Sequence, residues 1–507
     1  MKNITTTLLK GSLAAMLSLG IIACNKNDNP GMMPEGPDIL FYALDNGMNL
    51  LKYNAQSPKM PESNMTINGM QTGEKLIAID FRPATGQLYG LGTTNRLYVI
   101  NTISGVAVQI GPVLTPSLSS GIAGFDFNPT VDRIRVVTSN GQNLRLHPET
   151  GAVVATDGNI NGVTNAMITG VAYDNNFAGT TTTTLFDIDV QTDMLYKQDP
   201  PNNGTIVAIG DLGIDFNGEI GFDIAPGNEI ALATNDVKGK TALYRIDLAT
   251  GKAKSLGNIG GGSNITAIAI PTEPVAYAIS GGTNLLIFNP DKPAPIIKSI
   301  TGLQTGEMIV GIDFRPLNGQ LYALGSSSKL YTINSANGSS SSVGALPLST
   351  ILNGNNFGFD FNPTVDRIRV VSDAGQNLRL NPDNGMVAAI DGSLNPGMPV
   401  VSAAAYTNNF VGATITTLFD IDHATDKLYR QDPPNAGTLV EVGSLGLNIE
   451  GTNGFDIGGK SGMGWAILNS GGITKLYRID LNTGSASAQG NYVFSSSITG
   501  FTVGLGN

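Results

Sequence analysis

The chain has 507 residues, of which 41% are hydrophobic and only 14% charged, and it contains 64 glycines and 26 prolines. This composition is typical of neither a disordered chain nor a long-helical one, and the frequent turn residues favour β structure. The formal net charge of -11 argues against nucleic acid as a partner, because an acidic surface repels phosphate. Two histidines and one cysteine are too few for a structural zinc site or a disulfide framework. We therefore expect no metal site and no cofactor.

Residues 1–23 are predicted to be a lipoprotein signal peptide. Lys2 and Lys10 precede an apolar run over residues 13–23, which is shorter than the ~20 residues of a membrane-spanning helix. The run ends in Ile21-Ile22-Ala23-Cys24, which resembles the bacterial lipobox, whose cysteine is lipidated before cleavage. Cys24 is the sole cysteine of the chain, and the asparagine after it favours the outer over the inner membrane.

Residues 24–37 are predicted to be a flexible tether between this lipid and the rest of the protein. The segment contains three prolines and has no apolar periodicity, as expected of a linker. Several acyl chains on one cysteine anchor a protein firmly, because each buried CH₂ contributes ~0.8 kcal/mol. We therefore expect a protein of the cell envelope that is anchored to the membrane by a lipid on Cys24.

Nearly all of the remaining sequence is one unit written twice. The thirteen-residue segment FDFNPTVDRIRVV at 125–137 recurs unchanged at 359–371. Shorter repeats are TTLFDID at 183–189 and 416–422, QDPPN at 198–202 and 431–435, and LYRIDL at 243–248 and 476–481. We expect two units, residues 38–273 and 274–507.

Each unit contains a finer repeat of short apolar strands that end near an aspartate. These strand-end aspartates are Asp80, Asp126, Asp223, Asp313, Asp360 and Asp456. Between them lie three further short segments in which β-branched and aromatic residues alternate with polar ones and turn residues mark the ends, the pattern of strands and hairpins. Four strands at such a period indicate a propeller blade. The sequence therefore predicts an all-β fold of ten four-stranded blades, five per unit.

The chain ends leave two arrangements of these blades open. Residues 39–44 read as a second strand with no first strand before it, and residues 498–503 as a first strand with nothing after it, so together they would complete one blade. The segment Pro271-Thr-Glu-Pro274 is about as long as an ordinary hairpin turn, which suits one continuous ten-bladed ring. The alternative is two five-bladed rings in tandem.

The motifs GIDFRP, GQLY, FDFNPTVDRIRVV, QNLRL and QDPPN together resemble the bacterial family known as domain of unknown function 4394, over residues 38–507. The resemblance implies secretion and a repeat fold, and no catalytic residue carries over because the family has no established activity. The unit occurs singly in relatives, which implies that five blades close alone, so we favour two tandem five-bladed β-propellers. In several relatives the proline motif reads QNPPN, where this chain has Asp199 and Asp432.

The residues that could support catalysis favour a structural role. His147 aligns with Asn381 and His423 with Val190, so the two units share no Ser-His-Asp or Cys-His arrangement. The strand-end aspartates could supply paired carboxylates in a central funnel, as in glycoside cleavage. However, aspartates at turns commonly accept backbone N–H bonds, and their recurrence in most blades is what a structural role predicts. We expect no catalytic residue.

Two arginines are candidates for contact with an anionic ligand. By blade alignment, Arg135 and Arg369 occupy the position of Tyr89 and Tyr322, whose rings should pack between blades. A guanidinium there must be paired, because an unpaired buried charge costs ~3 to 5 kcal/mol. The nearest predicted partners are Asp126 or Asp132, and Asp360 or Asp366. The candidate ligand-binding residues are therefore Asp126, Arg135, Asp360 and Arg369, with architecture as the competing role.

Two further motifs have simple structural interpretations. The segments 187–193 and 420–426 carry aspartates at positions 1, 3 and 7, loosely like a calcium loop, but lack its glycine at position 6 and glutamate at position 12. A hairpin is therefore favoured. The QDPPN motif at 198–202 and its copy at 431–435 predict a rigid exposed turn, which is either a contact loop or only a turn.

Two functional classes remain. The first is a lipid-anchored, non-catalytic binding or scaffold module for a glycan, peptide or protein; the second is a carboxylate-dependent carbohydrate hydrolase or lyase. We favour the first. The feature that separates them is whether two or three carboxylates with raised pKa values converge in one solvent-reached funnel.

Overall fold

The computed structural model describes residues 36–260 and 263–507, so the predicted signal peptide, Cys24 and most of the tether lie outside the described residues. The described chain folds into ten four-stranded antiparallel sheets. It also forms two single 3-10 turns, η1 (Pro201–Asn203) and η2 (Pro434–Ala436). Within the described residues, no helix is long and apolar enough to cross a membrane. The prediction of ten four-stranded blades is confirmed.

The first unit forms blades 1 to 5, in each of which the strands run from the innermost outward. Blade 1 is β20 (Ile265–Ala269), β1 (Leu40–Asp45), β2 (Asn49–Asn54) and β3 (Ser63–Thr66). Blade 2 is β4 (Leu76–Phe81), β5 (Leu88–Gly92), β6 (Leu97–Ile100) and β7 (Ala107–Ile110). Blade 3 is β8 (Ala123–Asn128), β9 (Arg133–Thr138), β10 (Asn143–Leu146) and β11 (Val153–Thr156). Blade 4 is β12 (Ile168–Tyr173), β13 (Leu185–Asp189), β14 (Met194–Gln198) and β15 (Ile206–Asp211), and blade 5 is β16 (Phe222–Ile224), β17 (Ala231–Asp236), β18 (Thr241–Ile246) and β19 (Ala253–Asn258).

The second unit repeats this order in blades 6 to 10. Blade 6 is β40 (Ile498–Val503), β21 (Ala276–Ser280), β22 (Asn284–Phe288) and β23 (Ile296–Ser299). Blade 7 is β24 (Ile309–Phe314), β25 (Leu321–Gly325), β26 (Leu330–Ile333) and β27 (Ser340–Val343). Blade 8 is β28 (Phe357–Asn362), β29 (Arg367–Ser372), β30 (Asn377–Asn381) and β31 (Met386–Ile390). Blade 9 is β32 (Val401–Tyr406), β33 (Leu418–Asp422), β34 (Lys427–Gln431) and β35 (Leu439–Ser444), and blade 10 is β36 (Gly454–Ile457), β37 (Gly464–Ser470), β38 (Ile473–Ile479) and β39 (Ala486–Ala488).

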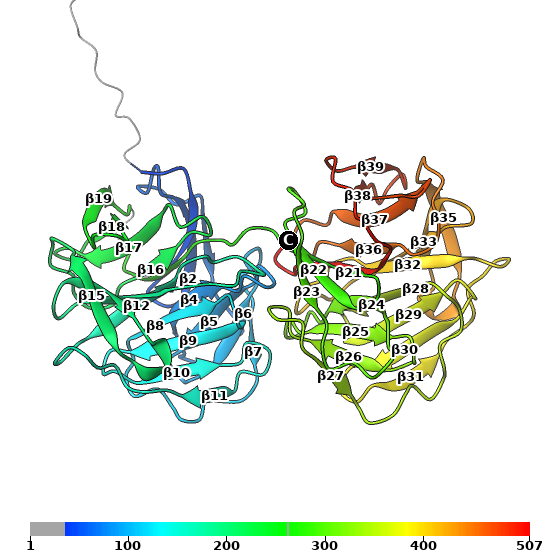
Figure 1. Ribbon diagram of the computed structural model, residues 1–507. Helices are drawn as coiled ribbons and strands as arrows, with labels where there is room; N and C mark the ends of the chain where they lie inside the picture. The colour runs from blue at the N-terminus through cyan, green and yellow to red at the C-terminus, as the bar shows by residue number, and fades with distance from the viewer. Residues whose placement is uncertain (1–35, 261–262) are drawn as a thin grey trace, which may run out of the picture.

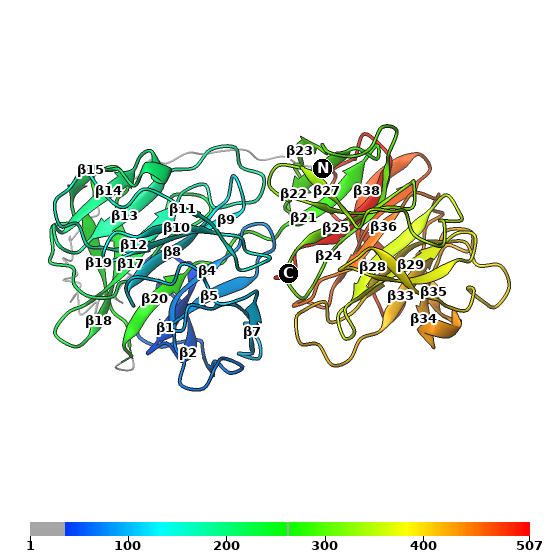
Figure 2. The same ribbon diagram turned by 90° about the horizontal axis from the view of Figure 1, so that it is seen from below.

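The pairing of the closing strands decides between one ring and two. β20 pairs with β1 of its own unit, and β40 pairs with β21 of its own unit. The inner strands β20, β4, β8, β12 and β16 contact one another in a circle, as do β40, β24, β28, β32 and β36. A single ten-bladed ring would instead need β20 beside β21 and β40 beside β1. The protein is therefore two tandem five-bladed propellers, which Figures 1 and 2 show as two bodies side by side.

The expected pairing of residues 39–44 with residues 498–503 is wrong. Each unit ends in the first strand of its own opening blade, because five blades bring the chain back to where that unit began. The short segment after β20 therefore connects two rings and is not a turn within one blade.

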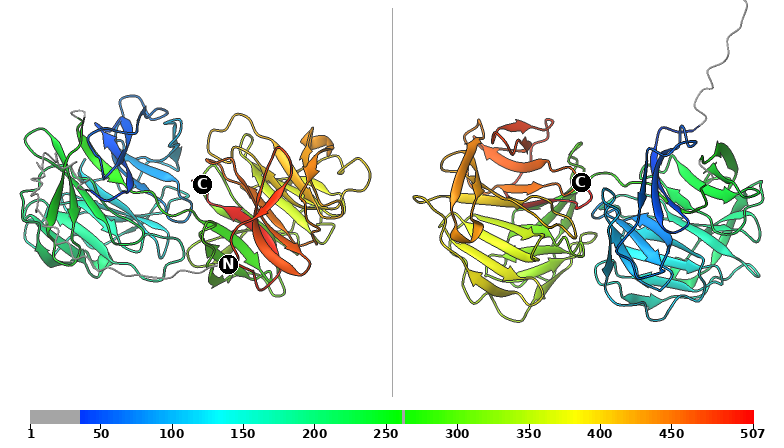
Figure 3. Two further views of the ribbon diagram at one scale, coloured as in Figure 1. Left: turned by 90° about the horizontal axis from the view of Figure 1, so that it is seen from above. Right: turned by 180° about the vertical axis from the view of Figure 1, so that it is seen from behind.

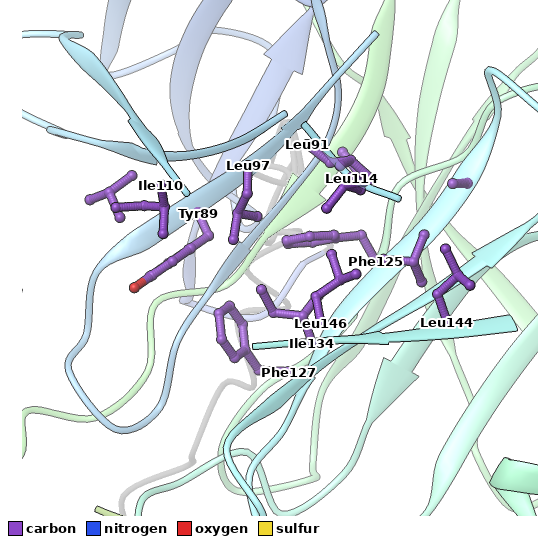
Figure 4. Packing of buried hydrophobic residues seen from close by; sticks show 14 of the residues in the cluster. Tyr89, Leu91, Leu97, Ile110, Leu114, Phe125, Phe127, Ile134, Leu144 and Leu146 are labelled. Carbon is purple, nitrogen blue, oxygen red and sulfur yellow. The ribbon is translucent and has the colours of Figure 1, made fainter. Parts of the chain in front are cut away.

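The aromatic rings of the second strands pack between blades, as predicted. The ring of Tyr89 on β5 lies 5.1 Å from that of Phe127 on β8, and Tyr322 lies 5.2 Å from Phe361 in the second ring. Figure 4 shows Tyr89 and Phe127 among the aliphatic side chains of blades 2 and 3. Burying one such side chain contributes about 1.5 to 3 kcal/mol, so these layers hold neighbouring blades together.

The end of the chain lies at the junction of the two rings (Figure 3). The Gly506 N–H donates to the Thr85 carbonyl, with N and O 2.8 Å apart, and Arg82 Nη1 donates to the Gly319 carbonyl at 2.9 Å. The Arg82 side chain is completely buried, whereas 9% of its counterpart Arg315 is exposed. The second ring therefore covers an ion-pair site of the first.

We predict that the first unit folds alone. A fragment from Pro37 to Pro271 contains every strand of the first ring, including β20, and should melt cooperatively as a monomeric β domain. Circular dichroism and size-exclusion chromatography measure this. A control fragment that ends at Ser263 lacks β20 and should not form a stable domain. If the longer fragment is soluble only when joined to residues 275–507, the unit depends on its neighbour and the prediction is wrong.

Candidate functional site

The six strand-end aspartates converge on the axes of the two propellers. They stand on the inner strands β4, β8 and β16 of the first ring (Asp80, Asp126, Asp223) and β24, β28 and β36 of the second (Asp313, Asp360, Asp456). Within each ring, one oxygen of each carboxyl lies within 4.8 Å of the others. All six residues are at most 1% exposed. The carboxyls therefore converge, as a catalytic funnel would require, but they lie away from solvent.

Each carboxyl joins its own blade to the next one. Asp80 accepts a hydrogen bond from the Phe127 N–H on β8 (2.9 Å), and Asp126 accepts one from the Tyr173 N–H on β12 (3.1 Å). The equivalent joints are Asp223 with Ile270, Asp313 with Phe361, Asp360 with Tyr406, and Asp456 with Val503. Three of the five blade junctions in each ring therefore contain a carboxyl that accepts a backbone N–H, as expected of aspartates with a structural role.

Glycines near these aspartates allow the inner strands to approach closely. A Cβ atom on Gly124 would lie 2.8 Å from the Val171 nitrogen, and one on Gly221 would lie 2.5 Å from the Ile268 nitrogen. Both separations are shorter than van der Waals contact, so only glycine fits at these two positions. The strands thus meet too tightly for a ligand to reach the carboxyls between them.

Burial raises the pKa of all six carboxyls. The pKa of Asp223 and that of Asp456 each rise to about 7. In the second ring the Thr502 hydroxyl oxygen lies 2.9 Å from a carboxyl oxygen of Asp313 and 2.9 Å from one of Asp456, and its single hydrogen donates to one of the two. Ala269 occupies the corresponding position of the first ring, so that ring lacks this donor.

The two candidate arginines are buried. Arg135 joins blade 3 to blade 4, and Arg369 joins blade 8 to blade 9. Arg369 is 2% exposed. Its Nη1 pairs with Asp391 (2.6 Å), its Nη2 donates to the Asn435 side-chain oxygen (2.8 Å), and its Nε donates to the Tyr406 hydroxyl (3.2 Å). Arg135 makes the same contacts with Asp157, Asn202 and Tyr173 in the first ring. Because Asn435 belongs to the QDPPN turn, Arg369 fixes that turn against blade 8.

The predicted partners of these arginines are wrong. Asp126 and Asp360 lie opposite Arg135 and Arg369 in the strand register, but backbone N–H groups hold their carboxyls at the axis while each guanidinium extends outward. The other predicted partners, Asp132 and Asp366, pair instead with Arg82 and Arg315 of the preceding blade. Alignment between blades predicted the strand positions of the two arginines. Their partners lie in loops, whose positions such an alignment does not predict.

The loosely calcium-like segments are hairpins, as expected. Residues 187–193 span the turn between β13 and β14, and residues 420–426 the turn between β33 and β34. Asp187 and Asp420 are completely buried, and neither carboxyl accepts a hydrogen bond from the residues that the structure describes. Burial raises the pKa of each to about 8, so both are predominantly neutral at pH 7.

An open pocket of about 530 Å³ lies between blades 8 and 9. It is lined by Asn362, Thr364, Tyr406, Thr414, Ile415, Thr416, Thr417, Leu418, Arg430, Gln431, Asp432 and Pro434. Gln431 is 1% exposed, and its Nε2 donates to the Pro434 carbonyl at 2.5 Å. Its Oε1 has no partner among the described residues. Arg430 and Asp432 form an ion pair of 3.3 Å.

Sequence reasoning found one edge of this pocket and missed the rest. The QDPPN turn, which the sequence predicted as a rigid turn, supplies Gln431, Asp432 and Pro434. Another part of the lining is the threonine-rich segment 414–417, whose counterpart 181–184 is a run of four threonines. That run of threonines was the one feature of the sequence from which this part of the pocket lining could have been predicted. The candidate residues Asp126, Arg135, Asp360 and Arg369 are not in the lining, although Arg369 bonds to Tyr406 and holds the turn.

We predict that the buried carboxyls make stability depend on pH. A group whose pKa is higher in the folded than in the unfolded state stabilises the fold. This stabilisation is complete below the unfolded-state pKa and is lost as the pH rises through the folded-state pKa. For Asp187 and Asp420 that window runs from about pH 4 to about pH 8. Each group then loses about 4 kcal/mol between pH 5 and pH 8, at ~1.4 kcal/mol per pH unit. The melting temperature should fall over this interval by roughly 8 to 16 °C, at ~2 to 4 °C per kcal/mol in domains of this size.

Substituting Asp187→Asn together with Asp420→Asn should make that fall smaller, measured by differential scanning calorimetry. Asp211→Asn, at an exposed carboxyl, is the matched control and should leave it unchanged. A melting temperature that stays level or rises over this interval would contradict the prediction.

Comparisons with known proteins give one family match and distant similarities to solved structures. No curated protein matches the chain. Among solved structures, the extracellular domain of the putative one component system BT4673 from B. thetaiotaomicron is 14% identical, with 90% of this chain and 65% of that chain covered and a TM-score of 0.27. PorZ, a surface component of the type-IX secretion system of Porphyromonas gingivalis, is 13% identical with 89% and 58% covered and a TM-score of 0.26. The Dos1 propeller is 13% identical with 63% and 82% covered and a TM-score of 0.25.

The chain thus spans less than two thirds of the length of the first two of these structures. The family model described as domain of unknown function DUF4394 matches it twice, at residues 49–269 and at residues 284–502. Each match falls within one five-bladed ring and runs from the third strand of its opening blade (β2 or β22) to its closing strand (β20 or β40). The chain therefore belongs to the DUF4394 family, in a tandem arrangement of two domains.

Proposed function

We propose that this protein is a lipid-anchored, extracytoplasmic propeller that binds a ligand without catalysing a reaction on it. One observation supports this most directly. The lining of the open pocket contains one carboxylate, Asp432, and it is paired with Arg430. Glycoside cleavage needs two carboxyls about 5 to 9.5 Å apart on either side of the bond. The pocket offers hydrogen-bonding groups but lacks that pair among its described lining residues.

The second candidate, a carboxylate-dependent hydrolase, has one feature in its favour. The axis carboxyls converge and have raised pKa values, which a general acid requires. However, they are at most 1% exposed and accept hydrogen bonds from the backbone of neighbouring inner strands. Contact with a polysaccharide would require those strands to separate. We therefore assign the carboxyls to architecture.

The predicted anchor sets how far the propellers stand from the membrane. Residues 24–37 span at most about 45 Å when fully extended, at ~3.3 Å per residue. A lipid on Cys24 would hold the first ring within that distance of the outer membrane and leave the faces of both rings accessible. A ligand in the envelope, whether glycan, peptide or protein, is the expected partner.

We predict that Cys24→Ser releases the protein from membranes. The sole cysteine is the predicted lipidation site, and lipidation supplies the membrane affinity. The measurement is membrane fractionation with mass spectrometry of the mature N-terminus. Equal membrane association of both forms, with an uncleaved wild-type precursor of unmodified mass, would overturn the anchor.

We also predict that the purified chain releases no product from neutral or acidic polysaccharides. The sensitive measurement is chromatography of reaction products, with Asp126→Asn plus Asp360→Asn as the test variant. Turnover of a defined polysaccharide that disappears in this variant, while its melting temperature at the assay pH stays the same, would establish the enzyme instead.

A further inference from the structure

We propose, on the basis of the binding role proposed above, that the pocket beside Gln431 and the matching groups beside Gln198 each bind a neutral sugar residue of a glycan. The pocket between blades 8 and 9 has a volume of about 530 Å³, within the ~300 to 1,000 Å³ typical of small-molecule sites. Its chemistry and its charge both favour this class of ligand.

The first argument is a buried acceptor that lacks a donor. The side-chain nitrogen of Gln431 donates to the Pro434 carbonyl, which fixes the orientation of the amide. The Oε1 of Gln431 has no partner among the described residues, although the side chain is almost completely buried and lines the pocket. An unsatisfied buried acceptor costs about 1 to 3 kcal/mol. Because this oxygen itself has almost no exposed surface, a ligand hydroxyl would donate to it after displacing the side chains that cover it.

The second argument is the set of threonine hydroxyls in the pocket lining. Thr416 donates its hydroxyl hydrogen to the Thr407 carbonyl, with the two oxygens 2.6 Å apart, so the Thr416 oxygen remains available as an acceptor. Thr414 and Thr417 add two further hydroxyls to the lining. Hydroxyls both donate and accept, so a polyhydroxylated ring can match such a mixed set. An apolar ligand would leave these groups unsatisfied.

The third argument is charge. Arg430 is the only cation among the described residues of the pocket lining, and Asp432 pairs with it at 3.3 Å. A phosphate or an acidic polysaccharide would have to compete with Asp432 for that cation, on a chain of net charge -11. A neutral glycan faces no such competition and can hydrogen-bond to both members of the pair.

The first ring carries an equivalent glutamine and ion pair at the matching positions. Gln198 is buried, its Nε2 donates to the Pro201 carbonyl at 2.6 Å, and its Oε1 also has no partner among the described residues. Lys197 pairs with Asp199 at 2.8 Å in place of Arg430 and Asp432. The exposed Ile415 of the second ring is replaced by Thr182. The protein should therefore bind two sugar ligands per chain.

The test is isothermal titration calorimetry of the full chain carrying Cys24→Ser. The probes are neutral hexasaccharides of glucose, mannose, xylose and galactose, with oligogalacturonate and a mixed tetrapeptide pool as the acidic and peptide arms. At least one neutral hexasaccharide should bind with a stoichiometry near two. Gln431→Leu and Gln198→Leu should each reduce that stoichiometry to one, and the double variant should abolish binding.

Two controls separate loss of the site from loss of the fold. Gln109→Leu makes the same change at a glutamine of an outer strand in blade 2 and should retain both sites. Thr417→Val removes a hydroxyl and keeps the side-chain shape. It should weaken binding at the second-ring site at least about 5-fold, because one hydrogen bond contributes ~1 kcal/mol. This variant tests the site even if Gln431→Leu fails to fold.

Binding of a neutral glycan that Gln198→Leu, Gln431→Leu and Thr417→Val leave unchanged would overturn the site while the proposed binding function stands. Binding of oligogalacturonate or peptides in place of neutral glycans would overturn the ligand class. If none of the probes binds, the inference is wrong; release of cleaved sugars during the titration would instead overturn the non-catalytic function.

Discussion

The closure of five inner strands around each axis is the constraint on which the rest of this protein depends. The strands approach so closely that a Cβ on Gly221 would lie 2.5 Å from a neighbouring backbone nitrogen. Their remaining N–H groups need acceptors, because unpaired buried backbone groups are costly. Aspartate carboxyls supply these acceptors at three of the five blade junctions of each ring. The recurring aspartate of the repeat follows from this need.

The same constraint separates structure from binding. Carboxyls within 4.8 Å of one another in an enclosed site cannot all ionise, because like charges and burial both raise their pKa values. These carboxyls hold the inner strands together at the axis, and ligands do not reach them. Toward the outside, Arg135 and Arg369 tie the QDPPN turns to the preceding blade. The turn of the second ring carries polar groups that line the pocket, so the proposed binding site lies between blades and away from the axis.

The sequence predicted the elements of this fold better than their connections. Alternating strands, the aspartate marks and the Tyr89 ring between blades were predictable because they follow from local periodicity. The pairing of residues 498–503 was not predictable, because this strand could complete a blade either with the first unit or with its own unit, and the two blades would have similar geometry. The arginine partners and the pocket escaped prediction for a related reason. Asp391 and the threonine segment 414–417 lie in loops whose position depends on blade packing.

The central claim is that the axis carboxyls are sealed, partly protonated structural groups. Infrared spectroscopy of the protonated carboxyl stretch, recorded from acidic to alkaline pH, tests it most directly when the chain is compared with its Asp126→Asn plus Asp360→Asn variant. The account predicts a protonated carboxyl band that persists at pH 7, weakens in the variant and exchanges slowly in deuterated water. Complete ionisation of all carboxyls by pH 6, or exchange within the mixing time, would contradict it.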